Sequence, residues 1–321
     1  MEIQISRDVR KFLITSVVFS FVFLAILSAL NYYFMSLVLA KTVVQLSDNQ
    51  FNEYASSTKT LFLGDSHSRN AIDPTFIPDS FNYAFSGENY AQTYYKLRYV
   101  LNNEKTNIKV VILPLDSHSF FVDMAENFQN DWFWKRFIDY GELSRNDKRI
   151  SYIQKTIVSW FPVIDNGGEL INNLKSGQKL SVLIKGYSAN DGNFAVVGDK
   201  AGDAKNRVDL QMNGKGVMDE VLLGYFEKTL ELAKLKGVRV YLVKFPVSRE
   251  YYVSATEATS KNDGYDFKIN NVLERHKEAT VLDFHSVYFD RPDFFHNSDH
   301  LNRAGSVDFT NLLRKNLNQN K

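Results

Sequence analysis

The sequence predicts an α/β protein with a parallel sheet that helices cover on both faces, preceded by a single transmembrane helix. Three observations carry this prediction. An uncharged apolar run of nineteen residues, 12–30, lies near the N-terminus. From residue 59 onward, short apolar runs alternate with amphipathic segments, which is typical of consecutive βαβ units. The clearest of these runs, IKVVILPL at 108–115, is apolar almost throughout, as expected of a strand buried on both faces.

The N-terminal run is long enough to cross a membrane. About 20 apolar helical residues span a hydrocarbon layer of roughly 30 Å. The aromatic-rich NYYF at 31–34 follows the run and suits the membrane interface, so we assign 12–34 to the anchor. The alternative is a cleaved signal peptide, whose apolar region usually covers 7–15 residues and ends in a small-x-small site. This run is longer and contains no clear site of that kind, which favours an uncleaved anchor.

The flanking charges predict the orientation of the anchor. Arg7, Arg10 and Lys11 precede the apolar run, whereas only Lys41 follows it closely. By the positive-inside rule, residues 1–11 are expected in the cytoplasm and the remainder of the chain on the periplasmic or extracellular side. Membrane lipid is therefore a predicted partner.

The rest of the chain divides into a linker and one α/β domain. The mixed polar segment 35–58 is predicted to be the linker, and 59–321 the domain. The alternation fails between about 120 and 215, where an aromatic-rich stretch is followed by a polar, glycine-containing one. We interpret this as a partly helical insertion, which either covers the active site, contacts a partner or is a peripheral subdomain. Strands are expected at 61–63, 108–115, 238–245 and 279–284, and helices at 90–104, 217–236, 267–278 and 304–317.

Composition excludes several classes of function. The chain has no cysteine, which rules out disulfides, thiolate zinc sites and a cysteine nucleophile. Its 38 basic and 37 acidic residues give a net charge of +1, so nothing indicates nucleic-acid binding. Neither a GxxxxGK[ST] loop nor a GxGxxG motif after a strand is present, and no cofactor is predicted.

The stretch TKTLFLGDSHSRNAIDP places Ser66 directly after the first predicted strand. In open α/β sheets, functional groups gather at the carboxyl ends of strands. A serine at this point can attack an acyl group, and free N–H groups of a following helix or turn can stabilise the resulting oxyanion. Serine is a weak nucleophile, so the chemistry requires a basic partner.

His300 is the preferred base, because it lies on the loop between the last strand and the last helix. His118 follows another strand and is the second choice as base, or a contact to oxyanion or substrate. His67 adjoins the serine, but sequence neighbours usually point apart. His285 ranks lower, and His296 is expected near the site. His296, Asp299 and His300 share one short loop with no further ligand evident from spacing, so no metal site is predicted.

Three blocks of the sequence resemble the SGNH (GDSL-like) hydrolase superfamily. These are GDSH at 64–67, Gly87 within FSGENY, and SDHLN at 298–302. The chain is most similar to its membrane-anchored branch of DltD-like and polysaccharide O-acyltransferases. The resemblance implies an SGNH/flavodoxin-like sheet, Ser66 as nucleophile and His300 as base. It also implies an oxyanion hole formed by the backbone N–H groups of Ser66 and Gly87.

Two positions depart from the family pattern. Asn297 stands three residues before the histidine, where the family usually has aspartate. Asp299, Asp293 or Asp283 could replace that aspartate, or a Ser–His dyad could suffice. Asp116 stands where the family commonly has an asparagine that donates to the oxyanion. An ionised carboxylate cannot donate, so Asp116 is expected to border the oxyanion or the substrate without being that donor. Asp65 is expected to hold the turn, and Asn70 to contact substrate or cap the following helix.

The expected function is O-acyl transfer, most simply O-acetylation, to a cell-envelope or exported polysaccharide through an acyl-Ser66 intermediate. The acyl donor would be supplied through a polytopic membrane acyltransferase, because a single span cannot carry acetyl groups across a membrane. The alternatives are an esterase or deacetylase acting on the same glycans, and a non-catalytic scaffold in a polysaccharide export complex.

Overall fold

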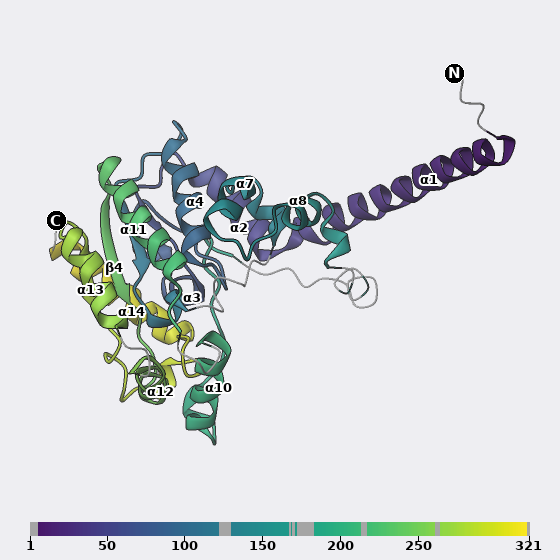
Figure 1. Cartoon of the computed structure of the whole chain (residues 1–321). Coiled ribbons are helices and arrows are strands. Elements are labelled where there is room, and N and C mark those ends of the chain that lie inside the picture. The colour runs from purple at the N-terminus through teal and green to yellow at the C-terminus, as the bar shows by residue number, and fades with distance from the viewer. Residues whose placement is uncertain are drawn as a thin grey trace.

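A five-stranded parallel sheet forms the centre of the molecule (Figure 1). The strand order is β2-β1-β3-β4-β5, which is a doubly wound order. After β2 the chain crosses over β1 to form β3 on its other side, so the strand order reverses between β1 and β3. The strands are β1 (Thr60–Phe62), β2 (Ser80–Asn82), β3 (Val110–Pro114), β4 (Arg239–Lys244) and β5 (Thr280–Asp283). The computed structural model describes residues 6–121, 130–166, 168, 171, 183–212, 217–260 and 264–319.

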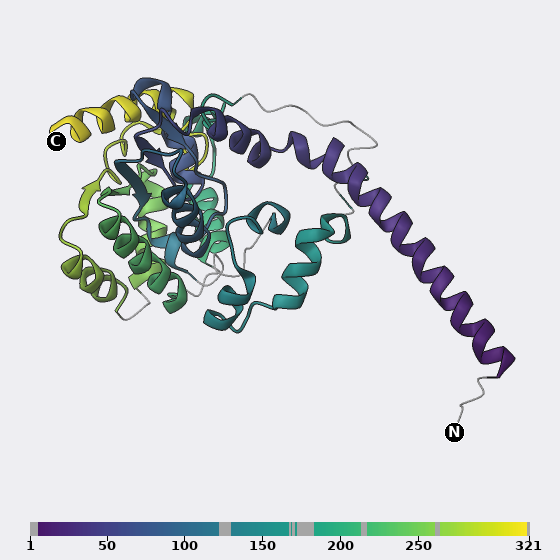
Figure 2. The same cartoon turned by 90° about the horizontal axis from the view of Figure 1, so that it is seen from above.

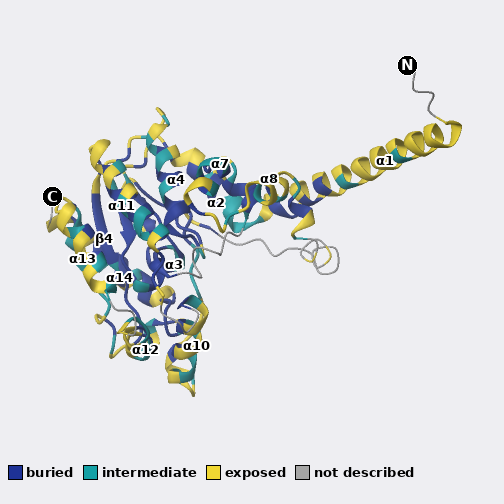
Figure 3. Ribbon diagram, in the orientation of Figure 1, coloured by how far each residue is buried: buried dark blue, intermediate teal, exposed yellow. Residues whose placement is uncertain are grey.

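Alternate residues of the strands face opposite sides of the sheet, as the period of two requires. Leu61 and Leu63 pack into a core with helices α4, α11 and α13, whereas Phe62 packs into a second core with α14. Both faces are therefore covered, which agrees with the predicted architecture (Figure 3). The helices of this part are α3 (Ser66–Ala71), α4 (Tyr90–Asn102), α11 (Glu220–Leu235), α12 (Arg249–Ser260), α13 (Tyr265–Arg275) and α14 (Arg303–Gln319).

The four predicted strands and four predicted helices are confirmed, with ends shifted by a few residues. Strand β2 and helix α12, both described here as part of the sheet and its covering helices, have no counterpart in the prediction. Strand β2 has only three residues, too few for a periodic pattern to emerge. Helix α12 buries only Tyr251 and Ala255, so its apolar face is narrow.

The N-terminal region is helical and differs from the predicted linker. Helix α1 (Arg7–Leu37) extends away from the domain, and its apolar stretch is exposed and long enough to cross a membrane (Figures 1 and 3). Half of the expected linker forms α2 (Val43–Tyr54). Phe51 of α2 is buried and stacks on Tyr83, with ring centroids 4.3 Å apart. The hydrophobic core therefore includes residues before position 59, which corrects the predicted boundary.

The described parts of the predicted insertion, which was expected to be partly helical, contain several helices. They include α6 (Asp131–Trp134), α7 (Tyr140–Asn146), α8 (Tyr152–Trp160) and α10 (Lys200–Met212). Most of the aromatic residues belong to the core, because Phe120, Phe121, Trp132, Phe133 and Trp134 are buried. Helix α10 lies apart from the others and packs against α12 (Figure 1). Residues 122–129, most of 167–182 and 213–216 of the predicted insertion lie outside the described residues.

Candidate active site

A tight turn carries the serine from β1 into α3. Gly64 has a φ of +107°, and a Cβ at this position would lie 2.4 Å from Cδ of Pro114 at the end of β3. Only glycine permits both the backbone conformation and this close approach. Asp65 then caps α3, because its Oδ1 accepts a hydrogen bond of 2.9 Å from the backbone N–H of His67. Ser66 is consequently the first residue of the helix.

Ser66 and His300 are in direct contact. The Oγ atom of Ser66 lies 2.8 Å from Nε2 of His300, although the two residues are 234 positions apart in the sequence. This is the distance that proton transfer between an alcohol and a base requires. Both residues line a cavity of about 520 Å³, so a substrate can reach the hydroxyl.

Two oxygen atoms approach the other ring nitrogen of His300. Its Nδ1 lies 3.2 Å from Oδ1 of Asp299 and 3.2 Å from Oδ1 of Asn297. Either oxygen can accept the Nδ1 proton and thereby leave Nε2 free to accept the proton of Ser66. Asn297 also accepts the backbone N–H groups of Asp299 and His300, at 3.3 and 2.9 Å, and so shapes the loop.

Residues from the insertion hold Asp299 in place. Nε and Nη2 of Arg207 each donate a hydrogen bond of 2.8 Å to the carboxylate, and Gln211 donates one of 2.7 Å. Arg207 and Gln211 are one turn apart on α10, so they present one face to the loop. The insertion therefore contributes to the site by fixing its carboxylate.

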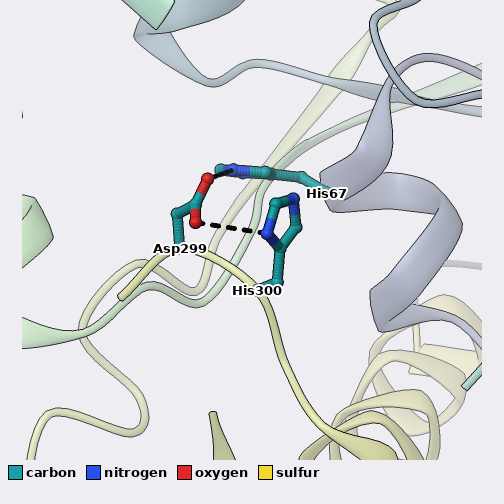
Figure 4. A group of neighbouring side chains, drawn as sticks. All are labelled: His67, Asp299 and His300. Carbon is teal, nitrogen blue, oxygen red and sulfur yellow. Dashed lines mark hydrogen bonds and ion pairs between the residues drawn. The ribbon is translucent and has the colours of Figure 1, made fainter. Parts of the chain in front are cut away.

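A second histidine, His67, lies next to His300 and contacts the same carboxylate. Nε2 of His67 lies 3.5 Å from Oδ2 of Asp299, and Nδ1 lies 2.9 Å from Oδ2 of Asp116. Figure 4 shows Asp299 beside the rings of His67 and His300, with a dashed line from its carboxylate to each ring. From its position next to Ser66 in the sequence, His67 is expected to point away from the serine. It does point away, but toward the carboxylate that faces His300.

The two histidines have opposite pKa shifts. Burial alone would lower the pKa of His67, but hydrogen bonds to Asp116 and Asp299 raise it to about 10. Burial also lowers the pKa of His300, and this effect prevails over the attraction of Asp299 because the charges of His67 and Arg207 add to it. At neutral pH, His67 is therefore a cation, while His300 is neutral and able to accept a proton.

The carboxylates of this site remain ionised despite being buried. Burial alone would raise the pKa of Asp299, but His300, His67 and Arg207 hold it well below its usual value. The pKa of Asp116 is likewise lowered, against burial, by hydrogen bonds from His285 and His67. Each buried anion thus has at least one cation or N–H donor facing it, as burial of charge requires.

Asp116 does not occupy the expected position at the oxyanion. Its side chain is buried, and Oδ1 accepts the backbone N–H of Phe245 at 3.0 Å and lies 3.0 Å from Nε2 of His285. The chain has an aspartate here because this position faces histidines and a backbone donor. The expectation that Asp116 contacts the oxyanion or the substrate is therefore corrected: its carboxylate forms a hydrogen bond with Nδ1 of His67.

His118 and Asp65 form a second pair beside the serine. Nε2 of His118 lies 2.8 Å from Oδ2 of Asp65, and Ser119 donates to the same oxygen at 3.1 Å. This nitrogen of His118 is thus directed to Asp65 rather than to Ser66. Burial would raise the pKa of Asp65, but the charge and hydrogen bond of His118 lower it. Asp65 holds the turn, as expected, and both residues border the cavity.

Gly87 and Asn70 also line the cavity at Ser66. Gly87 has a φ of +73°, a conformation that glycine adopts readily. The next residue, Glu88, is fully buried and accepts a hydrogen bond of 2.5 Å from Lys96, which fixes this loop to α4. Asn70 follows Ser66 by one helical turn and therefore shares its face of α3.

Several residues of the site could not be recognised from the sequence. These are His67, Arg207, Gln211 and Asn190, the last of which lines the cavity. Arg207 and Gln211 are spaced i, i+4, as on one helix face, but no helix was predicted at these positions and nothing in the sequence indicates what such a face contacts. Asp293 and Asp283, which were considered as supports for His300, instead pair with Arg291 and Lys244. His296 borders the cavity, as expected.

The geometry fits a hydrogen-bonded relay better than a metal centre. Ligand atoms of His67, Asp299 and His300 lie within 4.8 Å of one another (Figure 4). However, Asp299 already accepts hydrogen bonds from Arg207 and Gln211. A metal ion here would sit beside a guanidinium and would have to displace the Ser66–His300 contact or the buried imidazolium.

A larger cavity, of about 690 Å³, lies at the opposite end of the sheet. It is bordered by the first residues of β1, β3 and β4, together with basic side chains such as Lys59 and Lys109. In doubly wound sheets, reactive groups lie at the carboxyl ends of the strands. The smaller cavity at Ser66 is therefore the candidate active site.

No family model matches this chain, and no curated protein matches it significantly.

Proposed function

We propose that this protein is a membrane-anchored serine acyl-transfer enzyme of the SGNH type that acylates a cell-envelope or exported polysaccharide. The observation that carries the proposal is the 2.8 Å contact between Ser66 and His300 inside an accessible cavity. The imidazole is neutral at neutral pH, because its pKa is lowered, and a carboxylate lies 3.2 Å from its other nitrogen. This constellation has the roles of a nucleophile, a base and an orienting acid.

The reaction proceeds in two halves. Ser66 Oγ attacks the carbonyl carbon of an acyl donor while its proton passes to Nε2 of His300, and the imidazolium then protonates the departing donor oxygen. The product is an ester between the acyl group and Ser66. A sugar hydroxyl next attacks this ester, gives its proton to His300, and leaves as the O-acylated sugar while Ser66 recovers its proton.

Backbone N–H groups would stabilise the oxyanion that forms in each half. Ser66 is the first residue of α3, so its N–H has no carbonyl partner within the helix. Gly87 borders the same cavity and, without a side chain, leaves its backbone accessible. The amide of Asn70, on the serine's face of α3, is the candidate for a third donor, which Asp116 cannot supply. Loss of one such donor typically costs about 10²–10³ in rate.

The anchor favours an acceptor that is held near the membrane. Helix α1 is long and apolar enough to cross a bilayer, and its basic residues precede the apolar run, so the domain would lie outside the cytoplasm. Such a tether keeps the serine close to glycans under export and to a polytopic protein that delivers acyl groups. An esterase that acts on diffusible esters would gain less from being held at the membrane, because its substrates reach it by diffusion.

The first experiment tests the covalent step with the full-length protein. Purified protein should release p-nitrophenol from p-nitrophenyl acetate and incorporate one acetyl group at Ser66, detected by mass spectrometry of the peptide. Ser66→Ala should abolish both results. Ser57 is an exposed serine that precedes β1 in the chain, and Ser57→Ala should change neither result. Labelling of a different residue, or activity that survives in Ser66→Ala, would refute the mechanism.

The second experiment separates transfer from hydrolysis. In cells that lack the chain, the O-acetyl content of the exported polysaccharide should fall and should recover with wild-type protein but not with Ser66→Ala. A rise in O-acetyl content would identify an esterase instead. Recovery by Ser66→Ala would identify a scaffold, because the polymer would then depend on the fold and not on the hydroxyl.

A further inference from the structure

Helix α8 exposes an apolar face that its own domain does not cover. Ile153, Ile157 and Trp160 follow one another at helical spacing and form an apolar stripe, to which we add Ile164 in the short turn Pro162–Ile164 that follows the helix. Their exposed fractions are 69%, 48%, 62% and 53%. Of the three tryptophans in the chain, Trp160 alone is exposed, which sets it apart from the buried aromatic residues of the insertion.

The opposite side of α8 is firmly attached to the domain. Ser159 is buried, and Lys155 forms an ion pair of 2.8 Å with Asp131 of α6. The helix also packs against α7. The apolar stripe is therefore held in a fixed direction by the fold, rather than exposed through loose packing.

The end of α8 is bound to α1 at the point where its apolar run stops. Nδ2 of Asn31 donates a hydrogen bond of 3.0 Å to the carbonyl oxygen of Trp160, and the backbone N–H of Val163 approaches Oδ1 of Asn31 at 3.5 Å. Asn31 directly follows the uncharged run 12–30. Figure 2 shows α8 running across the direction of α1 rather than along it.

These contacts fix the depth of α8. If residues 12–30 fill the hydrocarbon layer, Asn31 lies at its boundary, and Trp160 must lie at the same level. Exposed Tyr32 and Tyr33 of α1 belong to this level too, which is where aromatic side chains are enriched. The ammonium of Lys135 donates to the carbonyl oxygen of Ser159 at 2.9 Å and lies 4.2 Å from the ring centroid of Trp160, which holds the end of α8 at this level.

We infer that α8 lies in the outer interface of the membrane that α1 crosses, with its apolar stripe inserted among the lipid chains. The occupant of this surface is lipid, because the stripe is continuous with the anchor and lies across it. Two attachments, one spanning and one interfacial, would restrain the tilt of the domain and hold the Ser66 cavity at a set orientation to the bilayer. This inference rests on the anchor in the proposed function.

The absence of cysteine allows a direct test of depth. Single-cysteine, full-length variants Ile157→Cys, Phe21→Cys and Leu235→Cys would be labelled with an environment-sensitive fluorophore and reconstituted into vesicles of phosphatidylcholine and phosphatidylglycerol. Nitroxide lipids would carry the quencher either near the headgroup or near the bilayer centre. Leu235 is the matched control, because it is exposed on α11, which packs against α4 and β4.

The expected pattern differs at the three positions. The label at 157 should be quenched most by the shallow nitroxide, the label at 21 by the deep one, and the label at 235 by neither. Quenching at 21 without quenching at 157 would overturn the inference and leave the anchor intact. No quenching at 21 would instead refute the anchor of the proposed function, and the inference with it.

A second set of variants tests whether the stripe itself makes the contact. Adding Ile153→Glu and Ile164→Glu to Ile157→Cys should cut shallow quenching at 157 at least twofold, because charge in the interface opposes insertion. Quenching at 21 and hydrolysis of p-nitrophenyl acetate should stay unchanged, since both substituted side chains are exposed and outside the Ser66 cavity. Undiminished quenching at 157 would show that the stripe does not hold α8 in the membrane.

Discussion

The outer and inner halves of the active-site region each contain a histidine beside a buried carboxylate, but the two histidines have different roles. In the outer half, His300 borders the cavity and contacts Ser66 and one carboxylate. In the inner half, His67 is buried between two carboxylates, Asp116 and Asp299. The rings are close neighbours, with centroids 5.4 Å apart, and they share Asp299. Nevertheless, the pKa of His67 is raised to about 10, while that of His300 is lowered.

The number of facing anions distinguishes the two protonation states, because burial lowers the pKa of both rings. Both rings are buried, and burial disfavours the charged form of each. The second carboxylate overcomes this penalty for His67. His300 has a single carboxylate, and two cations, His67 and Arg207, already face that group. The positive charge of His67 therefore helps to keep His300 neutral and able to accept a proton.

The comparison between His67 and His300 depends most on Asp299, the carboxylate that both rings contact. Asp299→Asn should lower kcat/KM for an acetyl ester by about 10⁴, as removal of the orienting charge does in serine hydrolases. The amide would also place an N–H₂ group among Arg207, His67 and His300, with too few acceptors. Steady-state kinetics measures the loss, and circular dichroism checks that the fold survives. Near-normal activity would mean that Asn297 alone orients His300.

The inner histidine should affect stability and the pH profile together. His67→Gln removes a buried cation that faces two carboxylates, a change that typically costs about 3–5 kcal/mol of unfolding free energy. Because the charge of His67 lowers the pKa of His300, its loss should also move the acid limb of kcat/KM to higher pH. Denaturant unfolding and a pH–rate profile measure these two effects. A merely structural role would lower stability and leave the limb in place.

The sequence allowed the outer half of the site to be predicted but not the inner half. Ser66 and His300 follow strands, and that position alone indicates the functional end of a parallel sheet. The partners of Asp299 could not be predicted, because Arg207 lies 92 positions away on a helix whose packing no periodicity reveals. The role of Asp116 was misjudged for a related reason. Its residue type was compared with a family pattern, whereas its surroundings, two histidines and a backbone N–H, determine its function here.

The same reasoning explains which parts of the fold were predictable. Strand β3 has a continuous apolar run because both faces are buried, so its sequence alone predicts it. The region 43–54 is polar because α2 buries only one narrow face, including Phe51, and also buries the charge of Asp48. The guanidinium of Arg136 and the hydroxyl of Tyr83 both donate to Asp48. A buried charge satisfied by distant donors looks like a surface residue in the sequence.

The proton on His67 makes stability depend on pH in a defined direction. Its pKa rises from an ordinary value near 6.5 to about 10 on folding, so the folded state binds this proton more tightly. The stabilisation is complete below pH 6.5 and is lost as pH rises toward 10. Wild-type protein should therefore show a falling unfolding free energy over this range, beyond that of His67→Gln. Parallel curves for the two proteins would mean that His67 is neutral in the folded state.

The finest test gives His300 the two anions that His67 already has. Asn297→Asp introduces a second carboxylate 3.2 Å from Nδ1, at the position where the resembled family has aspartate. By the comparison above, the pKa of His300 should rise and the acid limb of kcat/KM should move to higher pH, while activity on the alkaline side changes by about tenfold or less. A pH–rate profile measures the shift, with Asn297→Ala as the control that removes the amide without adding charge. An unmoved limb in Asn297→Asp would mean that Arg207 and His67 already neutralise any carboxylate in this loop, and that the count of facing anions does not decide the state of His300.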